Sequence, residues 1–99
     1  MNPSPEPSFA ARARALVQAG RVGALATHSR QRPGYPFGSV GPYAAGEQGR
    51  PVFLISGLAL HTKNLEADPR ASLLVTPPEP VDDPLAAPRV TVLGEARRL

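Results

Sequence analysis

The sequence predicts a mainly β (α+β) domain built from antiparallel strands, and three observations predict it. Five short runs of apolar or alternating residues are separated by turn-forming segments. An Ala-rich segment with helical spacing precedes them, and a shorter helical segment lies between the third and fourth runs. Thirteen prolines among 99 residues cluster outside the apolar runs, so they separate elements instead of marking disorder. A chain of this length can bury one small core.

The N-terminal segment is predicted to be a leader followed by a helix. Residues 1–7 hold three prolines and are expected to form a flexible, extended leader. Ser8 offers a side-chain oxygen as the N-cap of a helix over 9–19, and Gly20 is expected to end that helix in the left-handed conformation. The domain is therefore placed at residues 8–99. The apolar positions that share one face of the helix are Phe9, Ala13, Leu16 and Val17.

Three strands are predicted next, and they form an antiparallel meander because short turns join them. They span 22–27, 35–43 and 51–56, with a hairpin loop over 28–34 and a turn over 44–50. The third strand is predicted to be buried. Pro42 interrupts the second strand near its end, so that end is expected to be an edge or a bulge.

The second half of the chain is predicted to add a short helix and two strands. The helix falls within 57–68, with Thr62 near its first turn, and Asp68-Pro69 ends it. A strand follows over 71–76, and the proline-rich segment 77–88 is a long loop. The last strand, 89–99, alternates. Val90, Val92 and Ala96 point one way, and Thr91, Glu95 and Arg97 point the other.

The composition and motifs exclude several classes of site. The chain has no Cys and two His, with no clustered carboxylate spacing, which argues against a dedicated metal site. The glycine-rich dinucleotide motif and the P-loop lysine motif are absent, and the segment 37–41 lacks the first glycine of a nucleophile elbow. No apolar run is long enough for a membrane span, and the N-terminus lacks the pattern of a secretory signal. We therefore expect a cytoplasmic protein.

The segment that best fits a ligand is the end of the third strand and the start of the short helix. Backbone N–H groups at a helix start attract anions. Ser56 and Thr62 add hydroxyl donors there, and His61 and Lys63 add nitrogen donors or charge. A phosphate would fit this set. The purely structural alternative is that Thr62 caps the helix while His61 and Lys63 are solvated.

Two further residues allow two interpretations each. Ser39 lies in an otherwise apolar strand, where its hydroxyl faces either a ligand or water on the outer side of the sheet. Arg89 opens the last strand, where it either pairs with Asp82 or Asp83 or reaches a ligand with its fork of donors.

Taken together, these segments resemble the pyridoxamine 5′-phosphate oxidase-like FMN-binding split-barrel superfamily. Within it, the His-Thr-x-Asn pattern is most similar to the haem-utilisation (HugZ-type) branch. The resemblance covers residue 9 to the end in the same order and spacing. It rests on the segments 23–27 (GALAT), 36–40 (PFGSV), 55–65 (ISGLALHTKNL), 68–74 (DPRASLL) and 89–96 (RVTVLGEA).

The resemblance implies a split barrel and a set of cofactor-binding positions. Ser39 and Val40 would line the flavin, with Ser39 where the oxidases have an arginine. Ile55 and Ser56 match the strand end beside the ribityl phosphate. His61 and Thr62 fall where the oxidases carry an Arg-Lys pair, Lys63 follows them, and Arg89 matches a glutamine that contacts the flavin. These differences replace charge by hydrogen bonding at the phosphate. Proteins of this superfamily also continue beyond the position of Leu99, which implies that the chain lacks the C-terminal part of the barrel.

The resemblance makes an FMN-binding flavoprotein the leading function, with flavin-dependent redox chemistry on an unidentified substrate and no catalytic side chain that can be named. The alternative is a haem-binding or haem-degrading protein in which His28 or His61 ligates iron. A second alternative is a non-catalytic module for anions or nucleic acid. The net charge of +3 favours it, while the scattered arginines and the few aromatic residues count against it. The superfamily typically forms homodimers with the cofactor at the subunit interface, so a homodimer is also expected.

Overall fold

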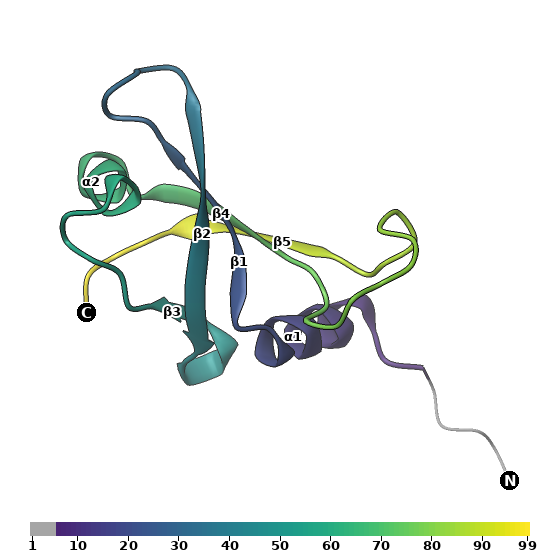
Figure 1. Ribbon diagram of the computed structural model, residues 1–99. Coiled ribbons are helices and arrows are strands. Elements are labelled where there is room, and N and C mark those ends of the chain that lie inside the picture. Colours follow the sequence, from purple (N-terminus) through teal and green to yellow (C-terminus); the bar gives the residue numbers. More distant parts are fainter. Residues whose placement is uncertain (1–5) are drawn as a thin grey trace, which may run out of the picture.

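The computed structural model describes residues 6–99 as a five-stranded antiparallel sheet with two α-helices (Figure 1). The strand order is β3-β2-β1-β4-β5. This confirms the mainly β class and the short helix between the third and fourth strands. Of the predicted leader, residues 1–5 lie outside the described part. The elements are α1 (Phe9–Ala19), β1 (Val22–His28), β2 (Pro36–Ala45), the 3-10 turn η1 (Glu47–Gly49), β3 (Pro51–Phe53), α2 (Leu60–Ala67), β4 (Arg70–Val75) and β5 (Val90–Glu95).

The sheet is strongly coiled, as a curled half-barrel is. β1 and β2 run steeply across the direction of β4 and β5, and α1 and α2 lie toward opposite ends of the sheet (Figure 1). Strand twist in antiparallel sheets accumulates into such curvature. Neither helix in the described residues is long and apolar enough to cross a membrane.

Helix α1 has the predicted bounds, but it ends differently from the prediction. The Ser8 hydroxyl accepts a hydrogen bond from the Ala11 amide at 3.1 Å and caps the helix as expected. Gly20 is extended, with φ −78° and ψ 157°, so the predicted left-handed end is wrong. The physical reason for glycine is space, because a Cβ at Gly20 would collide with the hydroxyl of Tyr43. That hydroxyl donates to the Val17 carbonyl at 2.7 Å and ties α1 to β2.

The third strand is shorter and more exposed than predicted, because Pro42 stops its pairing. β3 pairs with β2 through Tyr43 and Phe53, and the same register places Leu54 opposite Pro42. The Tyr43 amide donates to Arg21, so by alternation the nitrogen of Pro42 faces β3 and has no proton to donate. The ladder ends there, and Leu54 is 96% exposed. The predicted buried strand over 51–56 is therefore wrong. β2 itself continues through Pro42 to Ala45, and Pro42 pairs with Val22 of β1, so the predicted edge or bulge is wrong and only the side of Pro42 toward β3 is unpaired.

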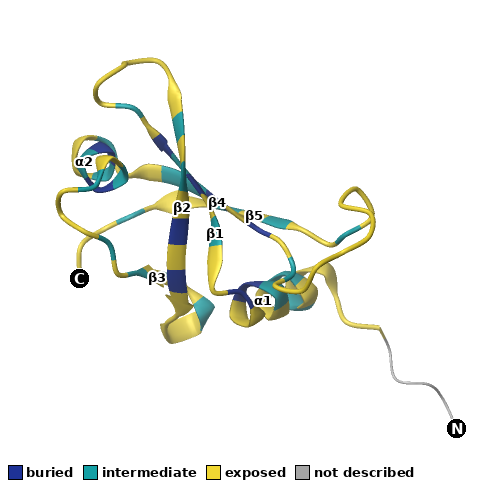
Figure 2. Ribbon diagram, viewed as in Figure 1, coloured by how far each residue is buried: buried dark blue, intermediate teal, exposed yellow. Residues whose placement is uncertain are grey.

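Buried and exposed residues alternate along β2 (Figure 2), which is the pattern of a strand with one inner and one outer face. Cross-strand partners share a face, so Leu25 lies between Ser39 and Leu73 on the inner face. The alternation predicted for the last strand is confirmed over Val90–Glu95, where Val90 and Val92 are half-buried on the inner face and Thr91 is exposed. The predicted extension to residue 99 is wrong, because the partner strand β4 begins at Arg70, opposite Glu95. The outer face exposes apolar side chains to solvent. The buried core consists of Val17, Leu25, Tyr43, Leu73 and Val75.

Candidate functional site

The structure joins two predicted site residues that are far apart in the sequence. Ser39 lies on the inner face of β2, and His61 lies in the first turn of α2. The Ser39 hydroxyl is 3.0 Å from Nδ1 of His61. The same hydroxyl donates to the Leu25 carbonyl at 3.5 Å. Ser39 therefore lies on the inner face beside His61 and does not face water on the outer side of the sheet, so the second of its two interpretations is wrong.

A second contact orders the segment that leads into α2. The Thr62 hydroxyl donates to the Ser56 carbonyl at 2.5 Å, and the Ser56 hydroxyl accepts from the Leu58 amide at 3.1 Å. Both hydroxyls predicted to bind phosphate are thus engaged with the backbone. Thr62 is buried, and this bond satisfies its hydroxyl. The contact resembles the structural alternative, except that Thr62 bonds a carbonyl before the helix instead of capping its free N–H groups.

The start of α2 leaves those N–H groups uncapped. The N-cap residue is Ala59, which has no side-chain capping bond. Lys63 is half-buried in the first turn, and Ile55 is half-buried just before Ser56. The structure therefore brings together a group of predicted positions around the start of α2, namely Ser39, Ile55, Ser56, His61, Thr62 and Lys63.

Val40 and Arg89 do not join this group. Val40 is 69% exposed and points to the outer face of the sheet, opposite to Ser39. Arg89 precedes β5 at the end that pairs with Val75, whereas α2 leads into the other end of β4. The guanidinium of Arg89 donates to the Leu85 carbonyl at 3.5 Å, and it makes no ion pair in the described residues. The suggested pairing with Asp82 or Asp83 is absent there.

Sequence reasoning missed Asn64, which holds α2 in place. Its side chain is only 3% exposed. The amide nitrogen donates to the Thr27 hydroxyl at 3.1 Å, and the amide oxygen accepts from the Arg30 amide at 2.9 Å. Because His61 and Asn64 are three residues apart on one helix, fixing Asn64 also fixes the position of His61. The signal was present in the sequence, since Asn64 is the last residue of the His-Thr-x-Asn pattern.

The outer face carries a separate charged pair. The Arg70 guanidinium makes two hydrogen bonds to the Asp68 carboxylate, at 2.7 and 3.1 Å. These bonds and the Arg70 backbone amide hold the pKa of Asp68 well below its usual range. Asp68 and Arg70 belong to the turn that starts β4. No group of three or more potential metal ligands occurs within residues 6–99.

Comparisons with known proteins identify the family. The family model of pyridoxamine 5′-phosphate oxidase matches residues 9–99. The chain belongs to this family. The fold described above is thus that of a pyridoxamine 5′-phosphate oxidase-like split-barrel chain, which confirms the superfamily resemblance.

Relatives within the family include proteins named for haem. The chain is 37% identical over 83 residues to the chloroplastic heme oxygenase HOZ of Arabidopsis thaliana, covering 84% of this chain and 25% of that protein. A heme binding protein from Mycobacterium smegmatis superimposes with a TM-score of 0.86 at 40% identity, over 97% of this chain and 38% of that one. The Agrobacterium tumefaciens protein Atu2129, described as of unknown function, superimposes with a TM-score of 0.79 at 36% identity, over 100% of this chain and 42% of that one. The chain thus spans less than half the length of these family members.

Proposed function

We propose that this chain binds haem at the face formed by β2 and the start of α2, with His61 as an iron ligand. The observation that carries the proposal is the 3.0 Å contact between Ser39 and Nδ1 of His61. A metal-ligating histidine usually has its other ring nitrogen held by a hydrogen-bond partner, which fixes the tautomer and the ring orientation.

The contact with Ser39 engages Nδ1 of His61 and leaves Nε2 available to a metal. When Nε2 binds a metal it carries the lone pair, so Nδ1 then carries the proton and donates it to the Ser39 oxygen. In that state the Ser39 hydroxyl donates to the Leu25 carbonyl, which lies 3.5 Å away.

The surroundings of His61 suit a flat, largely apolar ligand with acidic groups. Leu58 and Leu60 just before it are 86% and 42% exposed. Lys63 supplies a positive charge in the same turn of helix. A porphyrin combines an apolar ring with carboxylates, and bound haem iron would supply redox chemistry. The two relatives named for haem support the same ligand.

FMN is the second candidate, because the uncapped start of α2 and Lys63 fit a phosphate. The resemblance implies FMN, and flavin-dependent oxidoreductase activity depends on that binding. The Thr62 hydroxyl, however, donates to the Ser56 carbonyl and is not free for a phosphate, while the Ser56 hydroxyl accepts from the Leu58 amide and keeps its own proton. One of the two predicted hydroxyl donors is therefore lost, whereas haem would make use of the Ser39–His61 contact.

Titration of the purified protein with hemin and, separately, with FMN tests the proposal. We expect hemin to give a Soret shift with saturable binding. His61→Ala should change the Soret position and weaken binding by at least tenfold. His28→Ala is the matched control, because His28 is exposed on the outer face. It should leave the Soret position and the hemin affinity unchanged. Identical spectra for His61→Ala and the native protein would rule out His61 as the ligand. Binding of micromolar FMN without a hemin response would favour the flavin function instead.

The resemblance implies a homodimer, and we further propose that it forms through the outer face of the sheet, the face opposite to Ser39. That face exposes apolar side chains on four neighbouring strands, which a second copy would cover. They are Val22, Val40, Leu74 and Leu93. Nucleic-acid binding remains the least supported alternative. The cytoplasmic location stays a prediction that cell fractionation tests.

A further inference from the structure

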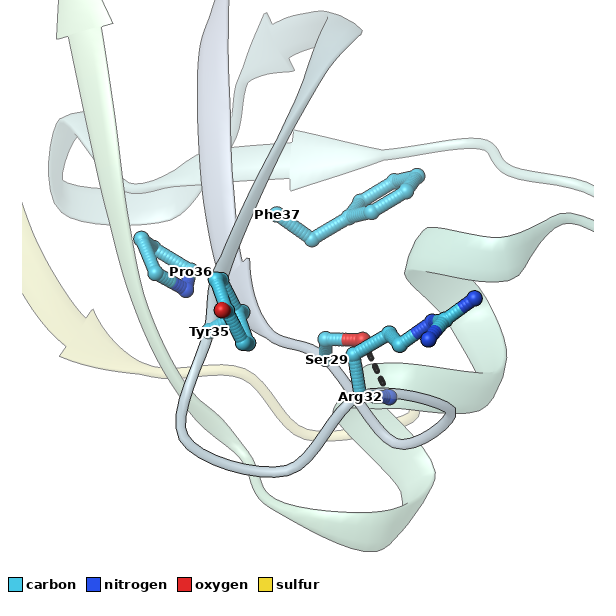
Figure 3. A pocket seen from close by; sticks show the side chains of 5 residues that line it. All are labelled: Ser29, Arg32, Tyr35, Pro36 and Phe37. Atoms are coloured by element: carbon cyan, nitrogen blue, oxygen red, sulfur yellow. Dashed lines mark hydrogen bonds between the residues drawn. The ribbon is translucent and has the colours of Figure 1, made fainter.

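A cavity of about 370 Å³ lies at the hairpin between β1 and β2, outside the site at His61. Five residues line it: Ser29, Arg32, Tyr35, Pro36 and Phe37. Figure 3 shows the Phe37 ring and the Arg32 guanidinium extending to the same side of the hairpin, with the Ser29 hydroxyl beside the Arg32 backbone and with Tyr35 and Pro36 away from that side. Its volume falls in the range of small-molecule sites.

Internal hydrogen bonds shape the hairpin loop. The Ser29 amide donates to the Tyr35 carbonyl at 3.0 Å, and the Tyr35 amide donates to the Arg32 carbonyl at 3.1 Å. The Arg32 amide donates to the Ser29 hydroxyl at 2.9 Å. Gly34 has φ +90°, a conformation that favours glycine and lets the loop close. These bonds hold the backbone of the loop and the Ser29 hydroxyl in position without a ligand.

Helix α2 anchors the same loop. The Arg30 amide donates to the buried Asn64 side chain, and Asn64 in turn holds Thr27 at the end of β1. A preformed site loses less conformational entropy when a ligand binds, which favours affinity. The backbone of the loop around the cavity is therefore fixed at both ends by hydrogen bonds.

The lining has the chemistry of a site for a planar acid. Tyr35, 69% exposed, and Phe37 offer aromatic surface, and Pro36 adds an apolar contact. The Arg32 guanidinium takes part in none of the ion pairs within residues 6–99. A guanidinium fork matches a carboxylate with two parallel hydrogen bonds. The Ser29 hydroxyl accepts from the Arg32 amide and keeps its own proton for a ligand oxygen.

We propose that this hairpin cavity binds a small planar aromatic carboxylate, with the acid on Arg32 and the ring against Phe37. Phe37 and Ser39 share one face of β2 and are about 7 Å apart along the strand. The ring would therefore lie on the same face of β2 as the Ser39–His61 pair. Its binding does not depend on the proposed cofactor, because no lining residue belongs to that pair.

The test is a titration of ¹⁵N-labelled, cofactor-free protein with 2-naphthoate, followed by amide chemical shifts. We expect saturable shifts centred on Ser29, Arg32, Tyr35 and Phe37. Arg32→Gln should weaken binding about tenfold, because it removes the charge-assisted hydrogen bonds. Naphthalene-2-carboxamide, which has the same ring without the charge, should bind the native protein about tenfold more weakly.

Arg30→Gln is the matched control, since it removes an equal charge two residues away from Arg32, outside the cavity lining. It should change the affinity for 2-naphthoate less than twofold. His61→Ala should also leave the affinity unchanged, which separates this site from the proposed haem site. Shifts located away from the hairpin, or binding that is not saturable, would overturn the proposal. Equal affinities for 2-naphthoate and naphthalene-2-carboxamide would also overturn it.

Discussion

His61 and Ser39, 22 residues apart in the sequence, meet with Nδ1 and Oγ 3.0 Å apart across the junction of α2 and β2. Removing the Ser39 hydroxyl leaves His61 in place but frees its ring to rotate. Because such supporting partners typically contribute 10- to 100-fold to metal affinity, Ser39→Ala should weaken hemin binding about tenfold. Ser72→Ala, on the outer face of β4, is the control and should have no effect. Unchanged hemin affinity in Ser39→Ala would show that the contact does not orient a ligand.

Asn64→Leu should destabilise the fold more than an ordinary helix substitution does. The change leaves the Thr27 hydroxyl and the Arg30 amide without their partner. Each unsatisfied polar group costs about 1–3 kcal/mol, so we expect the free energy of unfolding, measured by urea denaturation, to fall by about 2–4 kcal/mol. Glu66→Gln on the same helix breaks only an exposed ion pair with Arg98 and should cost less than about 1 kcal/mol. Equal losses in the two variants would contradict the anchoring role of Asn64.

Tyr43→Phe removes the hydrogen bond from the Tyr43 hydroxyl to the Val17 carbonyl and should cost about 1 kcal/mol near neutral pH. Burial raises the pKa of Tyr43 above its ordinary value of about 10. The folded state therefore keeps this proton more tightly than the unfolded state does. The contribution of Tyr43 to the free energy of unfolding is therefore constant below about pH 10 and decreases as the pH rises further.

The melting temperature of Tyr43→Phe should consequently fall less steeply above pH 10 than that of the native protein. Tyr35→Phe is the control, since Tyr35 is largely exposed, and it should retain the native alkaline slope. If the melting temperature of Tyr43→Phe fell above pH 10 as steeply as that of the native protein, this would contradict the raised pKa of Tyr43.

Asp68→Asn should flatten the loss of stability in acid. The Arg70 guanidinium holds the pKa of Asp68 well below its usual value of about 3.9. The pair therefore stabilises the fold above about pH 4, and the stabilisation is lost as the pH falls toward the lowered pKa. Melting temperatures between pH 5 and pH 2 check this. Asp82→Asn, in the exposed 77–88 loop, is the control and should show the same dependence of melting temperature on pH as the native protein. The native dependence in Asp68→Asn as well would contradict a stabilising role for the pair.

Val40→Asp should keep the chain monomeric if the outer face is the dimer interface. A charge in the middle of a buried apolar interface is strongly unfavourable. Sedimentation velocity should show a dimer for the native protein and for Gln18→Asp, which adds the same charge on exposed α1. A dimeric Val40→Asp variant would place the interface elsewhere.

Most elements of the fold could be predicted from local signals. Ser8, the Ala-rich run and Gly20 bounded α1 correctly, and alternation identified β5. The errors have tertiary causes. Gly20 is required by the approach of Tyr43, which is distant in the sequence, and not by its own backbone conformation. The length of β3 is decided by which strand edge Pro42 faces, and only the register reveals that.

The candidate site was predictable in part for the same reason. Spacing placed Ser56, His61, Thr62 and Lys63 at one helix start, and the structure agrees. Which hydroxyls remain free for a ligand depends on short backbone contacts, such as that from Thr62 to Ser56, that leave no pattern in the sequence. The hairpin cavity was not foreseen either, because it combines Arg32 and Phe37 through the folding of a loop.

The central place of β1 has a consequence for the order of folding. Leu25 pairs with Ser39, 14 residues away, and with Leu73, 48 residues away. Closing the shorter loop costs less entropy, so the β1–β2 hairpin should form first and β4 should dock later. Once β4 has docked, the backbone of β1 is hydrogen-bonded on both sides. Its amide hydrogens should then be among the slowest in the chain to exchange with solvent, while the edge strands β3 and β5 exchange through local opening.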